Sequence, residues 1–263
     1  MVSITKDTLR GRVALVTGST GGIGLAVAGC LAAAGCDLVL HGLAPPDEGA
    51  AAAADLAGRH AVQVRYHRAD LARPEAIAAM IAAVGAPDIL VNNAATRHFG
   101  AIEATPPADW DMDIAVNLSA AFHLTRLSLP GMRGRGWGRI VNMSSIYGLV
   151  GATGRVGYVT TKTALIGLTR ATALETAESG ITCNALCPGS TLTPNIAGRI
   201  GAAMAASGLG EAAATAQFLA GKQPTGRFVA ADAIGAMAAF LCSEAGRDIT
   251  GAVLPMDGGW SAM

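Results

Sequence analysis

Short runs of aliphatic and β-branched residues alternate along this chain with longer, alanine-rich runs. The short runs predict seven strands, at residues 12–17, 37–41, 61–66, 88–92, 139–143, 181–187 and 252–256. The longer runs predict helices over 22–34, 50–59, 117–133 and 156–178, and one more that opens at Pro74, since proline suits a first helical turn. The strands are continuously apolar, which is typical of strands buried on both faces.

This alternation predicts a single α/β domain over residues 1–263, doubly wound, with a seven-stranded parallel sheet flanked by helices on both faces. No linker rich in proline, serine or charge divides the chain. Ligands of such sheets bind beyond the carboxyl ends of the strands. The segment 190–227 breaks the rhythm just after a strand end, so we expect a mobile substrate lid of short helices there. A solvated insertion is the alternative.

Composition argues against several classes of protein. The 263 residues are 51% hydrophobic and 14% charged, with zero formal net charge, so there is no electrostatic footprint for nucleic acid. The N-terminus is polar, unlike a signal peptide, and no uninterrupted apolar run reaches the roughly 18 residues of a membrane span. Five scattered cysteines favour buried free thiols over a disulfide framework or a metal site. We therefore expect a cytoplasmic protein without a metal.

Tyr158 and Lys162 stand four residues apart on a predicted helix and therefore share one face. A neighbouring ammonium favours the ionised phenol and lowers its pKa from about 10, so such a tyrosine can exchange protons near neutral pH. The spacing alone also fits an ordinary solvated face. Two features favour the catalytic interpretation: Ser145, thirteen residues upstream, and a glycine-rich turn near the N-terminus.

That turn, residues 17–24, follows the first predicted strand and opens the first predicted helix. Gly18, Gly22 and Gly24 permit a tight turn and close approach of a pyrophosphate, while the helix N-terminus supplies amides and a positive dipole. The spacing differs from the G-x-G-x-x-G form, but strand, turn and helix in this order are what a nucleotide site requires. We therefore predict a Rossmann-type domain; a purely structural turn is the alternative.

The end of the second predicted strand decides between NAD and NADP. An acid there would hold the ribose hydroxyls of NAD, and an arginine would meet the 2′-phosphate of NADP. The chain has His41, Gly42 and Leu43 instead, and the glycine turn carries no basic residue. NAD is favoured because nothing obvious neutralises an extra phosphate, and NADP stays open. His41 is expected to be a hydrogen-bonded residue at the strand end.

Seven motifs in order resemble the classical short-chain dehydrogenase/reductase family over nearly the whole chain. They are TGxxxGIG at 17–24, Asp70-Leu71, Asn92-Asn93-Ala94, Asn117, Ser145, Tyr158 with Lys162, and Pro188-Gly189. Ala95 departs from the pattern, where the family usually has glycine, and we expect only a small local adjustment there. The resemblance implies an enzyme that interconverts a secondary alcohol and a ketone by hydride transfer with NAD or NADP.

The resemblance also implies a role for each matched position. Tyr158 would be the general acid/base, Lys162 would lower its pKa and bind the nicotinamide ribose, and Ser145 would polarise the carbonyl. Asn117 would hold a water that links Lys162 to bulk solvent. The positions implied for the cofactor are Gly18, Thr20, Gly22, Ile23, Gly24, Leu43, Asp70, Leu71, Asn93, Ala94, Ala95, Tyr158, Lys162, Pro188, Gly189, Thr191 and Thr193.

Longer stretches, among them 129–140, 182–189 and 241–246, look like 3-hydroxybutyrate dehydrogenases. In those enzymes a few polar side chains clamp the substrate carboxylate. In this chain Arg97, Tyr147, Arg155 and Ser190 stand where Gln, His, Lys and Trp are usual. The expected substrate-binding residues are therefore Arg97, Ser145, Tyr147, Arg155, Tyr158 and Ser190, with Arg199 as a further candidate.

These substitutions leave the substrate open. Arginines bind carboxylates bidentately, which favours an anionic substrate, and Ser190 would enlarge the pocket. A hydroxy or keto acid resembling 3-hydroxybutyrate is one candidate, and a broader range of ketones is the other. The alternatives are a 3-ketoacyl-type or broad carbonyl reductase using NADPH, and a non-catalytic nucleotide-sensing protein on the same fold. By resemblance, the apolar end at 257–263 and the long helices predict a homotetramer.

Overall fold

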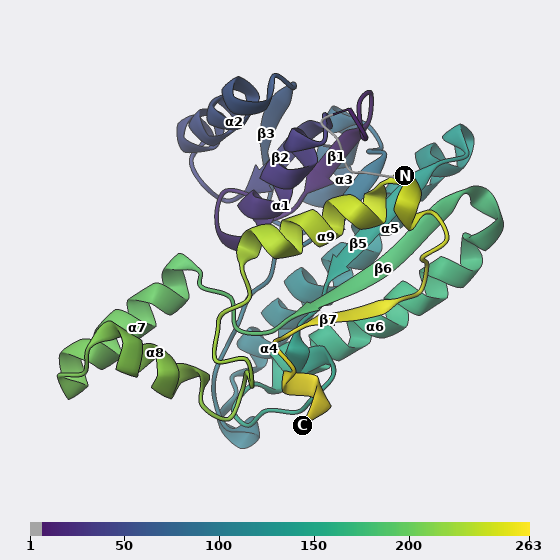
Figure 1. Cartoon of the computed structure of the whole chain (residues 1–263). Helices are drawn as coiled ribbons and strands as arrows, with labels where there is room; N and C mark the ends of the chain where they lie inside the picture. The colour runs from purple at the N-terminus through teal and green to yellow at the C-terminus, as the bar shows by residue number, and fades with distance from the viewer. Residues whose placement is uncertain (1–6) are drawn as a thin grey trace.

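The computed structural model describes residues 7–263. Its core is one seven-stranded sheet in which every neighbouring pair is parallel, in the order β3-β2-β1-β4-β5-β6-β7 (Figure 1). The strands are β1 (Val13–Val16), β2 (Asp37–Gly42), β3 (Val64–Arg68), β4 (Ile89–Asn92), β5 (Gly138–Met143), β6 (Ile181–Pro188) and β7 (Val253–Met256). The predicted doubly wound, Rossmann-type fold is confirmed, and strand order reverses between β1 and β4.

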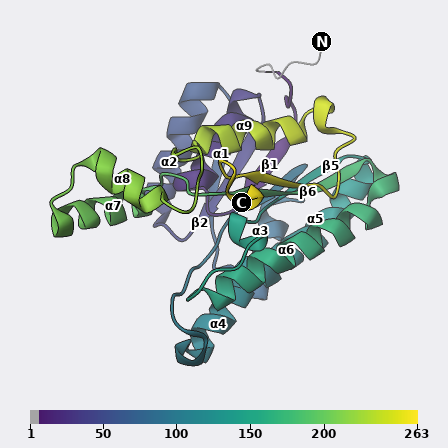
Figure 2. The same ribbon diagram turned by 60° about the horizontal axis from the view of Figure 1, so that its bottom comes forward.

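Helices cover both faces of the sheet. One face carries α1 (Gly22–Ala33), α2 (Pro46–His60) and α9 (Ala231–Cys242), and the other carries α3 (Pro74–Val84), α5 (Ala120–Arg135) and α6 (Val156–Glu175) (Figure 2). Strand β1 shows how both faces become apolar, because successive side chains point to opposite sides. Ala14 and Val16 belong to the apolar cluster with Leu31 of α1, whereas Leu15 belongs to the cluster with Leu124 of α5.

Several bounds differ from those expected. The third strand begins at Val64, later than expected, because α2 continues to His60. The residue after it, Ala61, caps the helix in a left-handed conformation (φ 56°). This strand is also not continuously apolar, since it lies at the edge of the sheet. The helix expected over 117–133 is the later part of a longer helical run. In this run α4 (Pro107–Ile114), which was not predicted, is followed by a π-helical turn (Ala115–Ser119) and by α5. Helix α9 was not predicted.

The segment 190–227 contains α7 (Pro194–Ser207) and α8 (Glu211–Leu219). They pack on each other through Ile196, Ile200 and Ala214, a small apolar cluster separate from the two that cover the sheet. Both views show this pair standing away from the sheet (Figures 1 and 2). Short helices are present as expected. No helix in residues 7–263 is both long and apolar enough to cross a membrane.

Candidate active site

The first turns of α6 bury the tyrosine and lysine together. Tyr158 is 4% exposed and Lys162 2% exposed. The Lys162 ammonium donates a hydrogen bond of 2.7 Å to the carbonyl of Met143 at the end of β5, and it lies 5.5 Å from the centre of the Tyr158 ring. A buried ammonium beside a phenol is the arrangement that the four-residue spacing predicts.

The charges around Tyr158 lower its pKa. Burial alone raises it, but the positive Lys162 and Arg97 outweigh burial, and hydrogen bonds from Ser145 and Arg97 add to their effect. Burial lowers the pKa of Lys162 in turn, while the phenol opposes that shift. A lowered pKa favours the ionised phenol, which is the form that can accept a proton from a bound hydroxyl group.

Ser145 lies two residues after the end of β5 and is the N-cap of the short 3₁₀ turn Ile146–Gly148. Its hydroxyl accepts a 3.2 Å hydrogen bond from the amide of Tyr147. The adjacent Ser144 donates to the carbonyl of Lys162 at 2.7 Å, which fixes the end of β5 against α6. A Cβ on Gly148 would lie 2.4 Å from the Ser144 hydroxyl oxygen, so this close approach requires glycine.

Asn117 lies in the π-helical turn and is 2% exposed. Its side chain accepts a 2.7 Å hydrogen bond from the amide of Thr96 and donates one of 3.2 Å to the hydroxyl of Thr161. Asn117 thus joins the loop after β4 to α6, beside Tyr158. π-turns inside helices often mark functional sites.

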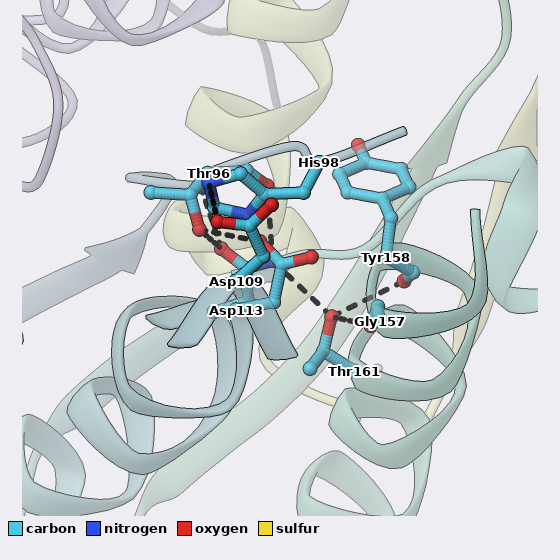
Figure 3. Close-up of polar contacts among 8 residues, drawn as sticks. Thr96, His98, Asp109, Asp113, Gly157, Tyr158 and Thr161 are labelled. Atoms are coloured by element: carbon cyan, nitrogen blue, oxygen red, sulfur yellow. Dashed lines mark hydrogen bonds and ion pairs between the residues drawn. The ribbon is translucent and has the colours of Figure 1, made fainter. Parts of the chain in front are cut away.

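A buried carboxylate that sequence reasoning missed supports the same loop (Figure 3). Asp113 accepts a 2.7 Å hydrogen bond from the Thr96 hydroxyl, and His98 Nδ1 lies 3.0 Å from the same oxygen. The other ring nitrogen of His98 is 3.7 Å from Asp109. Residues 96 and 98 are therefore fixed on both sides of Arg97. Asp113 belongs to none of the sequence motifs, and it is the only buried residue of α4.

Arg97 contacts Tyr158 directly. Its Nη2 donates a 3.0 Å hydrogen bond to the Tyr158 hydroxyl oxygen, and its guanidinium carbon lies 4.7 Å from the centre of the Tyr158 ring. Sequence reasoning expected Arg97 to face the substrate and did not foresee this contact. Arg97 therefore stands where it can act on both the tyrosine and a bound molecule.

The glycine turn is built as a dinucleotide site requires. A Cβ on Gly18 would lie 2.9 Å from Ala94 Cα, and a Cβ on Gly24 would lie 2.2 Å from the Gly18 carbonyl oxygen. The Asn93 amide donates to the carbonyls of Thr17 and Gly18, which holds the turn against β4. No side chain caps α1 and its first turn carries no acid, so its free amides fit the diphosphate of NAD or NADP.

His41 has the expected hydrogen-bonded role at the end of β2. The Gly18 amide donates to its Nδ1 at 3.2 Å, and its Nε2 donates to the carbonyl of Ala69 at 2.9 Å. Burial lowers the pKa of this imidazole. Both nitrogens are used within the protein, so His41 has no nitrogen left for a phosphate.

Two adjoining cavities meet at Tyr158, Ser145 and Arg97. The cofactor-side cavity is lined by Ile23, Asn93, Ala95, Arg97, Met143, Ser144, Ser145, Tyr158, Lys162, Pro188 and Gly189. The lining of the substrate-side cavity contains all six predicted substrate residues. It also contains the predicted Ile23, Gly189, Thr191, Thr193 and Arg199, and five residues that were not predicted for a site: Ile146, Ile196, Phe218, Lys222 and Trp260.

The other predicted cofactor residues lie outside both cavities: Gly18, Thr20, Gly22, Gly24, Leu43, Asp70, Leu71 and Ala94. The Leu71 side chain is in the apolar core, and Asp70 accepts a hydrogen bond from the Ala72 amide. Ala95 has no left-handed backbone angle, so alanine fits there without strain. Residues 7–263 contain no group of three His, Cys, Asp or Glu placed to hold a metal ion.

Comparisons with known proteins agree with this geometry. A family model described as Enoyl-(Acyl carrier protein) reductase matches residues 18–261. D-beta-hydroxybutyrate dehydrogenase of Cupriavidus necator is 46% identical over 259 residues, covering 97% of this chain and 99% of that protein. The chain belongs to the short-chain dehydrogenase/reductase family. It is an oxidoreductase that interconverts a secondary alcohol and a ketone with NAD or NADP.

The chain is also similar to a second dehydrogenase and to a reductase of known structure. D-beta-hydroxybutyrate dehydrogenase of Rhizobium meliloti is 42% identical over 255 residues, covering 95% of this chain and 99% of that protein. The crystal structure of L-sorbose reductase from Gluconobacter frateurii, complexed with NADPH and L-sorbose, superposes with a TM-score of 0.92 at 30% identity, covering 97% of this chain and 98% of that one. Relatives of this fold thus differ in substrate.

Proposed function

We propose that this enzyme oxidises a short 3-hydroxy acid to the 3-oxo acid with NAD, and catalyses the reverse reaction. The observation that carries the proposal is the pair Arg97 and Arg155, which line the substrate-side cavity beside Tyr158. Among residues 7–263, neither guanidinium has a carboxylate within 4.0 Å. Two unpaired guanidinium groups next to the catalytic hydroxyl suit a substrate carboxylate.

Aromatic side chains hold Arg155 at this wall of the cavity. Its guanidinium carbon lies 4.8 Å from the centre of the Phe99 ring and 4.9 Å from that of Tyr147. Tyr147 in turn packs edge-on against Trp260, with ring centres 5.4 Å apart. Aromatic contacts of this kind restrict a guanidinium while leaving its N–H groups free. The similarity to two D-beta-hydroxybutyrate dehydrogenases supports the same assignment.

The side chains divide the work as follows. The ionised Tyr158 takes the hydroxyl proton of the substrate, and Lys162 stabilises the phenolate until the proton is passed on. Ser145 donates a hydrogen bond to the substrate oxygen, which holds the reacting carbon in place. The nicotinamide ring supplies the hydride acceptor. Arg97 and Arg155 orient the substrate through its carboxylate, which makes the chemical step effectively unimolecular.

NAD is the proposed cofactor because the end of β2 offers little to a 2′-phosphate. Leu43 is 62% exposed there, and the Thr20 hydroxyl lies against Gly42. The nearby cation is Arg68, at the end of β3, whose Nε donates a 3.1 Å hydrogen bond to the Leu43 carbonyl. This hydrogen bond uses one of the five N–H groups of Arg68. If NADP is used as well as NAD, Arg68→Ala should remove that use selectively.

The proposal also includes the wider setting of the site. Residues 190–227 would act as a substrate lid, because α7 and α8 pack mainly on each other and contribute side chains to the cavity. We also propose a homotetramer in the cytoplasm. Five free cysteines, among them the buried Cys36 and Cys242, suit a reducing compartment.

The test is absorbance of the reduced nicotinamide, with NAD and NADP tried separately. The panel contains short 3-hydroxy acids, neutral secondary alcohols of equal length, and the matching ketones. We expect turnover of the acids with NAD at a higher kcat/KM than of the neutral alcohols. Turnover of neutral 3-oxo esters with NADPH alone would favour the 3-ketoacyl-type reductase. Cofactor binding without any turnover would favour a nucleotide sensor.

A further inference from the structure

Two more positive side chains line the substrate-side cavity, Arg199 and Lys222. Arg199 comes from α7, and Lys222 follows α8, so both belong to the segment 190–227. Both line the same cavity as Arg155, which precedes α6. The cavity therefore has four cationic side chains, although the proposed function assigns a task to only two of them, Arg97 and Arg155.

Arg199 and Lys222 both lie over the aromatic ring of Phe218. The Lys222 ammonium nitrogen lies 4.1 Å from the centre of the Phe218 ring, and the Arg199 guanidinium carbon lies 5.4 Å from it. The ammonium also donates a 2.8 Å hydrogen bond to the Phe218 carbonyl. Phe218 is itself packed against Phe228, with ring centres 5.8 Å apart. Two cations gathered on one supported ring form a defined subsite.

The subsite has no negative partner in the part of the chain that the structure describes. No carboxylate lies within 4.0 Å of Arg199 or Lys222 there. Burial lowers the pKa of Lys222, and the positive charges of Arg199 and Arg155 lower it further. Like charges held together without a counter-charge are unfavourable. Such an arrangement is relieved when an anion binds between them.

We propose that the substrate carries a second anionic group, a carboxylate or a phosphate ester, which Arg199 and Lys222 bind at the end remote from the carbon being oxidised. This rests on the proposed function, in which Arg97 and Arg155 hold the first carboxylate. A hydroxy acid of this class is a dianion that spans the cavity from α6 to α7 and α8. Because its second group binds the segment 190–227, the same contact would hold that segment over the substrate.

The first experiment compares kcat/KM for matched substrates with NAD. 3-Hydroxybutyrate and 3-hydroxypentanoate carry one carboxylate, 3-hydroxyglutarate and 3-hydroxyadipate carry two, and 3-hydroxy-4-phosphooxybutanoate carries a carboxylate and a phosphate. We expect at least one dianion to exceed the monoacids by about tenfold or more, as a charge-assisted hydrogen bond implies. The preferred dianion identifies the second group. A preference for monoacids over all dianions would overturn the proposal.

Variants then assign the effect to the subsite. Lys222→Met keeps the aliphatic stem on Phe218 but removes the charge, and Arg199→Gln removes the other. Each should lower kcat/KM for the preferred dianion about tenfold more than for 3-hydroxybutyrate. Arg227→Gln is the matched control, since Arg227 is exposed, lies in the same segment and does not line the cavity. It should leave the ratio of the two substrates unchanged.

Two outcomes distinguish failure of the second-anion proposal from failure of the proposed function. If both variants raise the KM for NAD and leave the substrate ratio unchanged, the pair serves the cofactor diphosphate, and the second-anion proposal is wrong. If the unaltered enzyme turns over none of the acids, the proposed function itself fails. Inhibition gives an independent readout: glutarate, which cannot react, should compete with substrate more strongly than butyrate, and Lys222→Met should remove the difference.

Discussion

Arg97 Nη2 lies 3.0 Å from the Tyr158 hydroxyl oxygen and donates a hydrogen bond to it. The Tyr158 phenol is therefore flanked by two cations, because the Lys162 ammonium lies 5.5 Å from the ring centre. Burial raises the pKa of Tyr158, and these two positive charges reverse that effect. Where the family resemblance assigns this task to the lysine alone, this chain adds an arginine that also lines the substrate-side cavity.

Replacing Arg97 should change the pH dependence of the enzyme. In the proposed mechanism, oxidation of the alcohol requires ionised Tyr158, so the rate should rise with pH through the pKa of the phenol. Arg97→Gln removes a positive charge and a hydrogen bond that both lower this pKa. The acidic limb of the kcat profile for oxidation should therefore move to higher pH, as measured over a pH series with saturating substrate.

Arg155→Gln is the control for this shift. Arg155 lines the same cavity, but it is not among the groups that shift the pKa of Tyr158. Both variants should raise the KM for a carboxylate substrate, and only Arg97→Gln should displace the acidic limb. If the acidic limb of the kcat profile lies at the same pH in both variants, Arg97 does not lower the pKa of Tyr158.

Tyr158→Phe should abolish most of the turnover and leave the cofactor bound. Loss of a general acid/base typically costs about a hundred- to ten-thousandfold in rate, while the buried ring and its packing remain. Turnover by absorbance and NAD affinity by calorimetry measure the two effects separately. Tyr66→Phe is the matched control, because its hydroxyl donates only to the Ala44 carbonyl in the fold. Near-normal turnover by Tyr158→Phe would remove the tyrosine from the mechanism.

The sequence could predict that Ser145, Tyr158 and Lys162 lie together, because their positions depend on short-range geometry or on strand ends. Tyr158 and Lys162 needed only helical spacing. Ser145 lies just beyond the end of β5 and Pro188 is the last residue of β6, and the carboxyl ends of parallel strands meet at one edge of the sheet. In this chain β5 and β6 are neighbours, so the two residues come together without any knowledge of the loops. The confirmed sheet of seven parallel strands follows from the same regularity.

Lys222 and Asp113 could not be predicted because they reach the site through irregular segments. Lys222 depends on how α7 and α8 fold against each other, and its only sequence signal was rarity, as one of three lysines. Asp113 lies in α4, before a π-turn that periodicity does not announce. Helix α9 is apolar on nearly all sides, so it lacks the amphipathic stripe that marks a surface helix.

The quaternary structure is testable through exposed apolar side chains on the long helices. Leu174 on α6 is 80% exposed and Phe122 on α5 is 47% exposed, as expected of side chains that neighbouring copies cover. Light scattering after gel filtration should give four chains per particle at micromolar concentration. Leu174→Glu should reduce that number, whereas Leu209→Glu, in the turn between α7 and α8, should not. A monomer in the unaltered protein would contradict the homotetramer.

Gly157 tests whether the buried carboxylate network supports the active site. A Cβ at this position would lie 2.5 Å from Asp113 Oδ2, so Gly157→Ala should displace the carboxylate that holds Thr96 and His98 beside Arg97. We expect a loss of about 1–3 kcal/mol in the free energy of unfolding, typical of overpacking, together with a lower kcat. Chemical denaturation and steady-state kinetics measure the two effects.

Gly58→Ala is the control for Gly157→Ala. Gly58 is exposed in α2, and a Cβ there would meet nothing within 4 Å, so alanine should stabilise the helix by up to about 1 kcal/mol. Both substitutions add one methyl group to a helix, but Gly157→Ala should lower the free energy of unfolding and Gly58→Ala should raise it. If Gly157→Ala lowers stability while kcat stays normal, the Asp113 network serves the fold alone. If both quantities fall, and Gly58→Ala leaves kcat unchanged, the position of Arg97 depends on that carboxylate.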